Sequence, residues 1–600
     1  ETASKHNIFD FLSRDPRTYL PTLSSARILP RKKYFKLGKI KIALGKPLIQ
    51  GFRRSLPFWK VLGLKGIGST ILRVPITFPP EKFHGELLSG MCTPDLKGSQ
   101  GTFSFYTSDP AKIYEKESGL TIPVQINNKV ITTHLSGPEN DQTKEEVKIP
   151  LHIKIKNENE IVIEVSGQKF CLRQGVFSPW INLTFPMGWG IKIKAIARFY
   201  LSSVSPHFNL YVTPLNIDPG KPALPISHPF YYSIYLSQLL GPFITLGEAN
   251  DTWALNEGAL SEKAFLDLAY LNHAEWEKML FNALKKRRRG AIVCVFETTD
   301  SIQHMFWRYL EKDHPALKKG PTELGPEIIR ELYQRMDKLV GQVMSSLKKR
   351  DYLIVMSDHG FKSFRRGVNL NSWLHLEGYL SLKDGAPESA SWFKEVNWEK
   401  TKAYALGLGG LYLNLVGREA KGIVNPGEEA KKIKKEIKEK LLALRDETTG
   451  ERPILHVYDR DEIYSGPYKD NAPDLIIGYN KGYRASWDSV IGKVNRFIFE
   501  DNQKAWSGDH CLDPPEVPGV IFANFPLASD KPSIIDLAPT ILELFGLEVP
   551  AYMDGHSLLP LEKREKPTGR AILLASDSKK SKELKKHKKN NNKAKFKKNE

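Results

Sequence analysis

The sequence predicts an α/β fold built around a mostly parallel sheet. Two apolar runs, 289–296 and 352–356, have the composition of strands, and each follows a helical stretch, 275–288 and 326–349 respectively. Helix-then-strand units favour parallel pairing within one sheet. Because both runs are continuously apolar rather than alternating, we expect these strands to be buried on both faces.

A different pattern occupies the region between about 107 and 218. Residues 151–156 and 161–165 alternate apolar and polar side chains on either side of a polar turn. This alternation predicts an antiparallel hairpin with one face in water. Similar short strands are expected at 191–196 and 208–212. We therefore predict a β-sandwich-like insertion in the α/β core, and a return to helices from 227 to 288 that could roof a cleft.

Length and composition limit the class of protein. A chain of 600 residues exceeds one ordinary domain. The sequence contains no apolar run of about 18 residues, so no membrane-spanning helix is expected. The four cysteines are widely separated and form no C-x-x-C motif, which supports neither a disulfide scaffold nor a zinc ribbon.

Positive charge is concentrated at the C-terminal end. Residues 579–600 contain eleven Lys and two Glu, so they supply +9 of the formal net charge of +20. A segment this charged, with almost no apolar content, is expected to be disordered. A solubilising tail is the simplest interpretation, and weak non-specific contact with nucleic acid or an anionic membrane stays open as an alternative.

Three short segments combine imidazoles with carboxylates. Asp300 and His304 follow the first apolar run, Asp358 and His359 follow the second, and His510 precedes a third apolar run. In a parallel sheet the carboxyl ends of the strands share one edge, where ligands bind. Asp300 and His304 are four residues apart and would share one helix face. Together these side chains are the ligand types of a paired-metal site.

The same residues carry a resemblance to a known family. Ser357–Phe361, the upstream Asp300/His304 pair and the late His510 resemble the alkaline phosphatase superfamily, in its type I phosphodiesterase/nucleotide pyrophosphatase branch. Further similar stretches are 5–11, 101–106, 365–371, 472–475, 536–540 and 553–558. The resemblance extends from residue 5 to about 560, and it implies an alkaline-phosphatase-like, mostly parallel sheet sandwiched by helices.

The resemblance implies two divalent ions, with Zn²⁺ favoured and Mn²⁺ compatible. Asp300, His304 and His510 match the ligands of one ion, and Asp358 and His359 match two ligands of the other. In the family, a further aspartate and a bridging Ser or Thr nucleophile lie upstream of the segment that begins here at Lys5. We therefore expect the first strand, the nucleophile and part of the second metal site to be absent from this sequence, and a single ion to bind tightly.

The sequence patterns and the resemblance together predict four parts of the chain. They are the N-terminal part of the core at 1–106, the β-rich insertion at 107–218, a metal-binding core with a helical cap at 219–562, and the basic tail at 563–600.

The implied activity is hydrolysis of a small phosphate ester, of the phosphodiester or nucleotide pyrophosphate type, by in-line attack, and we expect it to be impaired in this chain. Arg365 and Arg366 are candidates for clamping the substrate phosphate. Two alternatives stay open: a mutase-like phosphoryl transferase, and a non-catalytic, metal-stabilised binding protein. A sulfatase is disfavoured because Cys92-Thr93-Pro94-Asp95-Leu96 has leucine where that family needs arginine.

Overall fold

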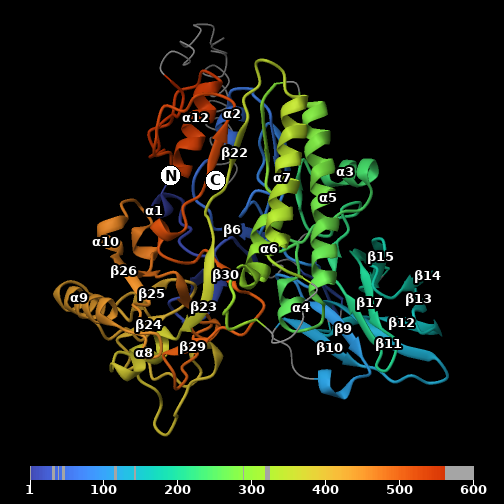
Figure 1. Ribbon diagram of the computed structural model, residues 1–600, viewed down its shortest axis with the longest axis horizontal. Coiled ribbons are helices and arrows are strands. Elements are labelled where there is room, and N and C mark those ends of the chain that lie inside the picture. Colours follow the sequence, from blue (N-terminus) through green and yellow to red (C-terminus); the bar gives the residue numbers. More distant parts are fainter. Residues whose placement is uncertain are drawn as a thin grey trace, which may run out of the picture. The chain divides into compact units, whose positions relative to one another are not determined.

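The computed structural model describes residues 2–29, 34–37, 40–43, 48–113, 118–140, 143–188, 190–287, 289–317 and 324–560. The chain divides into two compact units, Glu1–Phe525 and Pro526–Glu600. The fold is mixed α/β, with several sheets of mixed strand orientation (Figure 1). The basic tail predicted at 563–600 lies outside the described residues.

One sheet has the order β20–β8–β7–β21. Its strands are β7 (Ser69–Leu72), β8 (Gly85–Leu88), β20 (Ser227–His228) and β21 (Ala291–Cys294). As predicted for helix-then-strand units, β21 runs parallel to β7, and β7 runs parallel to β8. Helix α5 (Glu262–Lys286) packs on this sheet through Trp276 and Met279. Helix α7 (Glu327–Ser346) lies beside α5 (Figure 1).

The second predicted strand differs from expectation. β22 (Ile354–Met356) pairs antiparallel with β31 (Ile521–Ala523), and among the described residues it has no other strand partner. Both β21 and β22 are half-buried rather than buried on both faces. The reason is that each stands at the edge of its sheet. The expectation of parallel pairing is met for β21 with β7 and β8, but not for β22.

Among the described residues between 103 and 217, strands are the main regular element. The predicted hairpin is confirmed: β12 (Glu146–Asn157) pairs antiparallel with β13 (Glu160–Val165). The other strands are β9 (Phe103–Thr107), β10 (Gly119–Pro123), β11 (Val130–Glu139), β14 (Gln168–Arg173), β15 (Ile181–Pro186), β16 (Lys192–Ala197), β17 (Phe199–Ser203), β18 (Asn209–Val212) and β19 (Asn216–Ile217). Their inward residues form one apolar core, which the alternating pattern predicted.

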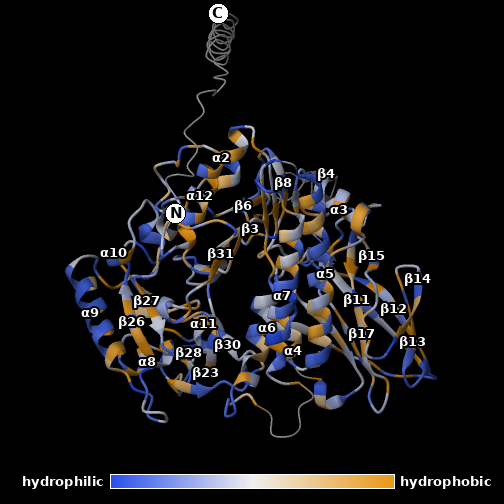
Figure 2. Cartoon of the chain, turned by 45° about the horizontal axis from the view of Figure 1, so that its top comes forward, coloured by the Kyte–Doolittle hydropathy of each residue, from blue (hydrophilic) through white to orange (hydrophobic). Residues whose placement is uncertain are grey.

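A further group of elements lies between residues 362 and 509. The strands are β23 (Lys362–Val368), β24 (Ala403–Ala405), β25 (Gly410–Leu413), β26 (Ile454–Asp459), β27 (Leu475–Tyr479), β28 (Gly482–Ala485), β29 (Phe499–Asp501) and β30 (Gly508–Asp509). The helices are α8 (Leu370–Leu376), α9 (Glu428–Ala443), α10 (Arg460–Ile463) and α11 (Trp487–Val490). Figure 2 shows α9 as largely hydrophilic, and its few apolar residues, such as Ile437, are buried.

The remaining elements are α1 (Ala3–His6), β1 (Leu12–Arg14), β2 (Pro21–Leu23), β3 (Ala26–Leu29), β4 (Tyr34–Leu37), β5 (Ile40–Ala43), β6 (Leu48–Gly51), α2 (Phe58–Leu64), α3 (Tyr232–Leu240), α4 (Thr252–Asn256) and, in the second unit, α12 (Leu537–Leu544). Within the described residues, no helix combines the length and apolar character needed to cross a membrane. All four cysteines are free, and Cys92 is buried.

Candidate metal centre

Helix α6 (Thr298–Phe306) positions the first two candidate ligands. It begins four residues after β21 ends, and it carries Asp300 in its first turn and His304 in its last. Oδ1 of Asp300 lies 3.4 Å from Nε2 of His304. The imidazole is 2% exposed and the carboxylate 39% exposed, so the pair opens toward solvent on the carboxylate side.

His510 completes a group of three donors. Its Nε2 lies 3.6 Å from Oδ1 of Asp300, and the ligand atoms of Asp300, His304 and His510 all lie within 4.8 Å of one another. Two donors that bind one tetrahedral Zn²⁺ at about 2.0–2.1 Å are about 3.3–3.4 Å apart. The observed separations of 3.4 and 3.6 Å are close to that spacing and long for hydrogen bonds. The donor set therefore fits a divalent ion.

The other ring nitrogen of His304 is already committed. Nδ1 of His304 donates to the carbonyl oxygen of Gly508 at 2.7 Å, which leaves Nε2 as the ligand atom. The indole of Trp506 lies against the imidazole, with ring centroids 3.7 Å apart, and Phe361 meets it edge-on at 4.8 Å. The ring is therefore held in one tautomer and one orientation before any ion binds.

Asp509 supports the cluster, and the sequence reasoning gave it no role. One carboxylate oxygen accepts from the backbone amides of His510 and Cys511, each at 2.8 Å. The other accepts from Nε1 of Trp506 at 2.8 Å and pairs with Nε of Arg484 at 2.7 Å. Asp509 and Arg484 are 1% and 2% exposed. The position of Asp509 next to the predicted ligand His510 could have suggested a supporting role. Its partner Arg484 is distant in sequence, so their ion pair could not be predicted.

Burial and neighbouring charges shift the pKa values of all three donors. Burial alone would raise the pKa of Asp300, but the charges of His304, His510 and His359 bring that pKa below its ordinary value. Burial alone would lower the pKa of His304, but the Asp300 carboxylate and the Gly508 carbonyl raise it. Burial, reinforced by the charge of His304, lowers the pKa of His510 to about 4. His510 is thus neutral at pH 7, the form that binds a metal.

Asp358 and His359 lie next to this cluster. The rings of His359 and His510 stack with centroids 3.6 Å apart. This proximity follows from the antiparallel pairing of β23 with β30, which sets Lys362 opposite Asp509. Asp358 Oδ2 lies 3.5 Å from His359 Nε2, but its side chain is 65% exposed. The structure therefore brings all five predicted ligands together, three as a compact group and two as an open pair.

A second donor group, Asp509, His510 and Cys511, is also compact. It is a weaker candidate because Asp509 already accepts from Trp506, Arg484 and two backbone amides. Burial, reinforced by the Asp509 charge, raises the pKa of the Cys511 thiol well above its ordinary value. The raised pKa makes the thiolate, which is the form that binds a metal, harder to form.

Both predicted substrate arginines are engaged by carboxylates. Arg365 binds Glu311 at 2.7 Å and Asp313 at 3.1 Å, and Arg366 binds Asp446 and Asp501. A phosphate would have to compete with these partners for either guanidinium. Their role in substrate binding stays a prediction.

A set of charged residues that the sequence reasoning missed adjoins Asp300. Burial, together with the charges of Glu297 and Asp300, raises the pKa of Glu248 to about 8. Arg73 is 1% exposed and contacts both oxygens of Glu297 at 2.9 and 3.0 Å. It follows directly after β7, so the carboxyl ends of the parallel strands β7 and β21 bring these charges to the same edge as Asp300.

Comparison with known proteins identifies part of this chain. Residues 221–493 match the family model described as Type I phosphodiesterase / nucleotide pyrophosphatase. The match assigns the segment to that branch of the alkaline phosphatase superfamily, which confirms the resemblance predicted from the sequence. It contains Asp300, His304, Asp358 and His359, and it ends before His510. No curated protein matches the chain.

Proposed function

Since the chain contains a segment of the type I phosphodiesterase/nucleotide pyrophosphatase branch, we propose that it acts as a metal-dependent hydrolase of small phosphate esters, of the phosphodiester or nucleotide pyrophosphate type. The observation that carries the proposal is the group formed by Asp300, His304 and His510, whose ligand atoms lie within 4.8 Å of one another. One carboxylate and two imidazoles at this spacing suit Zn²⁺, and Mn²⁺ is compatible with the same donors.

The residues would divide the work as follows. Asp300, His304 and His510 hold the tightly bound ion, and Asp358 with His359 supplies two donors for a second ion. Bound divalent ions polarise a phosphoryl oxygen and stabilise the charge that develops on the attacking and leaving oxygens. Asp509 and Trp506 keep the imidazoles in place. Arg365 or Arg366 would bind the substrate phosphate only after exchanging a carboxylate partner.

A test of this proposal measures hydrolysis of a chromogenic phosphodiester, bis(p-nitrophenyl) phosphate, after the chain is loaded with Zn²⁺ or Mn²⁺. Because the activity is expected to be impaired, we expect slow nitrophenol release that stops on chelation and is lost in Asp300→Ala. The matched control is Asp470→Ala, because the Asp470 carboxylate is 88% exposed and belongs to another part of the chain. Turnover that survives both chelation and Asp300→Ala would contradict the proposal.

The two alternatives give different results in the same assay. A mutase-like transferase would move the phosphoryl group from a phosphomonoester to an added alcohol rather than to water, so the product ratio separates transfer from hydrolysis. A non-catalytic, metal-stabilised protein would gain thermal stability with Zn²⁺ and turn over neither substrate. If its basic tail binds nucleic acid, deletion of 579–600 would remove a salt-sensitive association without changing metal affinity.

A further inference from the structure

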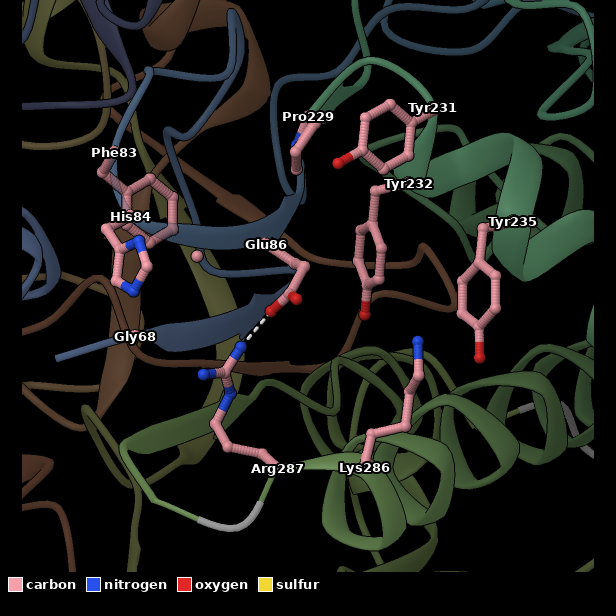
Figure 3. A pocket seen from close by; sticks show the side chains of 11 residues that line it. Gly68, Phe83, His84, Glu86, Pro229, Tyr231, Tyr232, Tyr235, Lys286 and Arg287 are labelled. Carbon is pink, nitrogen blue, oxygen red and sulfur yellow. Dashed lines mark hydrogen bonds and ion pairs between the residues drawn. The ribbon is translucent and has the colours of Figure 1, made fainter. Parts of the chain in front are cut away.

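A cavity of about 440 Å³ lies away from the metal-ligand cluster. Its walls come from the starts of β7 and β8, the start of α3 and the end of α5, and its lining includes His84, Tyr231, Tyr232, Tyr235, Lys286 and Arg287. The volume is within the range of pockets that hold small organic ligands. Figure 3 shows Phe83 and His84 on one side, three tyrosines on the other, and the two cationic side chains below them.

This cavity and the metal-ligand cluster occupy opposite ends of one sheet. Gly68 and Gly85, which line the cavity, stand at the amino ends of β7 and β8. Asp300 lies beyond the carboxyl end of β21, which is parallel to β7. A four-residue strand alone spans about 13 Å. A ligand in the cavity therefore does not touch the metal ligands.

One wall of the cavity is fixed by Arg287. Its Nε donates to the hydroxyl of Thr70 at 2.7 Å, and its Nη2 pairs with Glu86 (Figure 3). A Cβ on Gly68 would come within 2.5 Å of Nη1, so the glycine leaves room for the guanidinium. These contacts hold the Arg287 guanidinium in one position at the base of the cavity.

Lys286 supplies a charge that no described carboxylate neutralises. Its ammonium lies 3.8 Å from the ring centroid of Tyr235, and it forms no ion pair within the described part of the chain. Arg287 and Glu86 balance each other, so the lining carries an excess positive charge. The opposite wall is aromatic: Tyr232 is 5% exposed, whereas Tyr231 is 56% exposed and presents its ring to the mouth.

From this combination we infer that the cavity binds an aromatic monophosphate, with the planar ring against the tyrosines and the phosphate toward Lys286 and Arg287. Aromatic side chains stack on planar rings, and lysine and arginine bind phosphate through charge-assisted hydrogen bonds. The site is separate from the metal centre, and its occupancy does not depend on the proposed hydrolytic activity.

Calorimetric titration of the full chain with adenosine 5′-monophosphate tests the inference. The buffer contains a chelator, so the metal centre contributes no binding. We expect Lys286→Ala and Tyr231→Ala each to weaken binding by at least about tenfold. Lys285→Ala and Tyr352→Ala are the matched controls, because both side chains are exposed and neither lines the cavity. Circular dichroism of all four variants is the control for correct folding.

Adenosine and inorganic phosphate separate the two halves of the ligand. Each is expected to bind at least about tenfold more weakly than the complete monophosphate. The inference is overturned if the monophosphate gives no saturable heat at about 1 mM. It is equally overturned if phosphate alone binds as tightly, or if Lys286→Ala binds like the unaltered chain.

Discussion

The two groups of candidate metal ligands use the same chemical types but receive different support from the fold. Asp300, His304 and His510 form a compact group in which His304 is 2% exposed and donates to the Gly508 carbonyl. Asp358 and His359 sit on an open turn, where the Asp358 side chain is 65% exposed. We therefore expect the compact group to bind an ion more tightly than the open pair, because its donors are ordered before the ion arrives.

The largest expected effect distinguishes the two groups directly. Asp300→Ala removes the carboxylate that both imidazoles face, so affinity for the tightly held Zn²⁺ should fall by more than about a hundredfold. Asp358→Ala should change that affinity by less than about threefold. Competition with a chromogenic chelator measures both variants, with Asp470→Ala as the control. Equal losses in Asp300→Ala and Asp358→Ala would remove the distinction between the groups.

The next effect concerns Asp509 and Trp506, which hold the ligand residues in place. Asp509→Asn leaves the buried Arg484 without its carboxylate, so thermal unfolding should show a loss of about 3–5 kcal/mol. Metal affinity should fall by about 10–100-fold. Trp506→Phe is the milder companion, because it keeps a ring against His304 and removes only the hydrogen bond to Asp509. If neither variant changes metal affinity, the contacts of Asp509 and Trp506 do not contribute to metal binding by the compact group.

The pH dependence of metal binding gives a third, smaller test. Burial alone would lower the pKa of His304, but Asp300 raises it above the ordinary value, so protons compete with the ion as the pH falls from neutral. His510, with a pKa of about 4, stays neutral over the same range.

Affinity should therefore be full above the raised pKa of His304 and fall about tenfold per pH unit below it, which is a slope of one proton. Chelator competition at several pH values measures the slope. A slope of two or more from these three ligands would show that His510 also takes up a proton in this range.

The smallest effect is expected at Arg365. Its guanidinium is held by Glu311 and Asp313, so Arg365→Ala should change metal affinity by less than about twofold. The same variant addresses its predicted role in substrate binding. A rise in KM for a phosphodiester, with kcat unchanged, would indicate that the guanidinium binds substrate in the ground state.

The sequence predicts those features of the fold that depend on residues close together in the chain. Asp300 and His304 were expected to share a helix face on the condition that a helix begins near Asp300, and α6 meets that condition. The hairpin of β12 and β13 follows from the local alternation of apolar and polar residues, and it was predicted. The partner of β22 was not, because an apolar run does not specify which strand it pairs with, and β31 lies far along the chain.

The same limit applies to the metal centre. The five ligands were recognisable from residue type and from their positions after apolar strands. Asp509, Arg484 and Trp506 were not assigned roles, because their value lies in contacts that form only when β23 pairs with β30 and β28. Glu248 likewise acquires its raised pKa from burial and from Glu297 and Asp300, which are distant in sequence.

The most direct measurement is anomalous diffraction at the zinc edge from a crystal of the full chain soaked in Zn²⁺. The account predicts a strong peak about 2.0–2.2 Å from Oδ1 of Asp300, Nε2 of His304 and Nε2 of His510. A peak at Asp358 and His359 would be weaker. The strongest peak at Asp509, His510 and Cys511, or no peak at Asp300, would contradict the account.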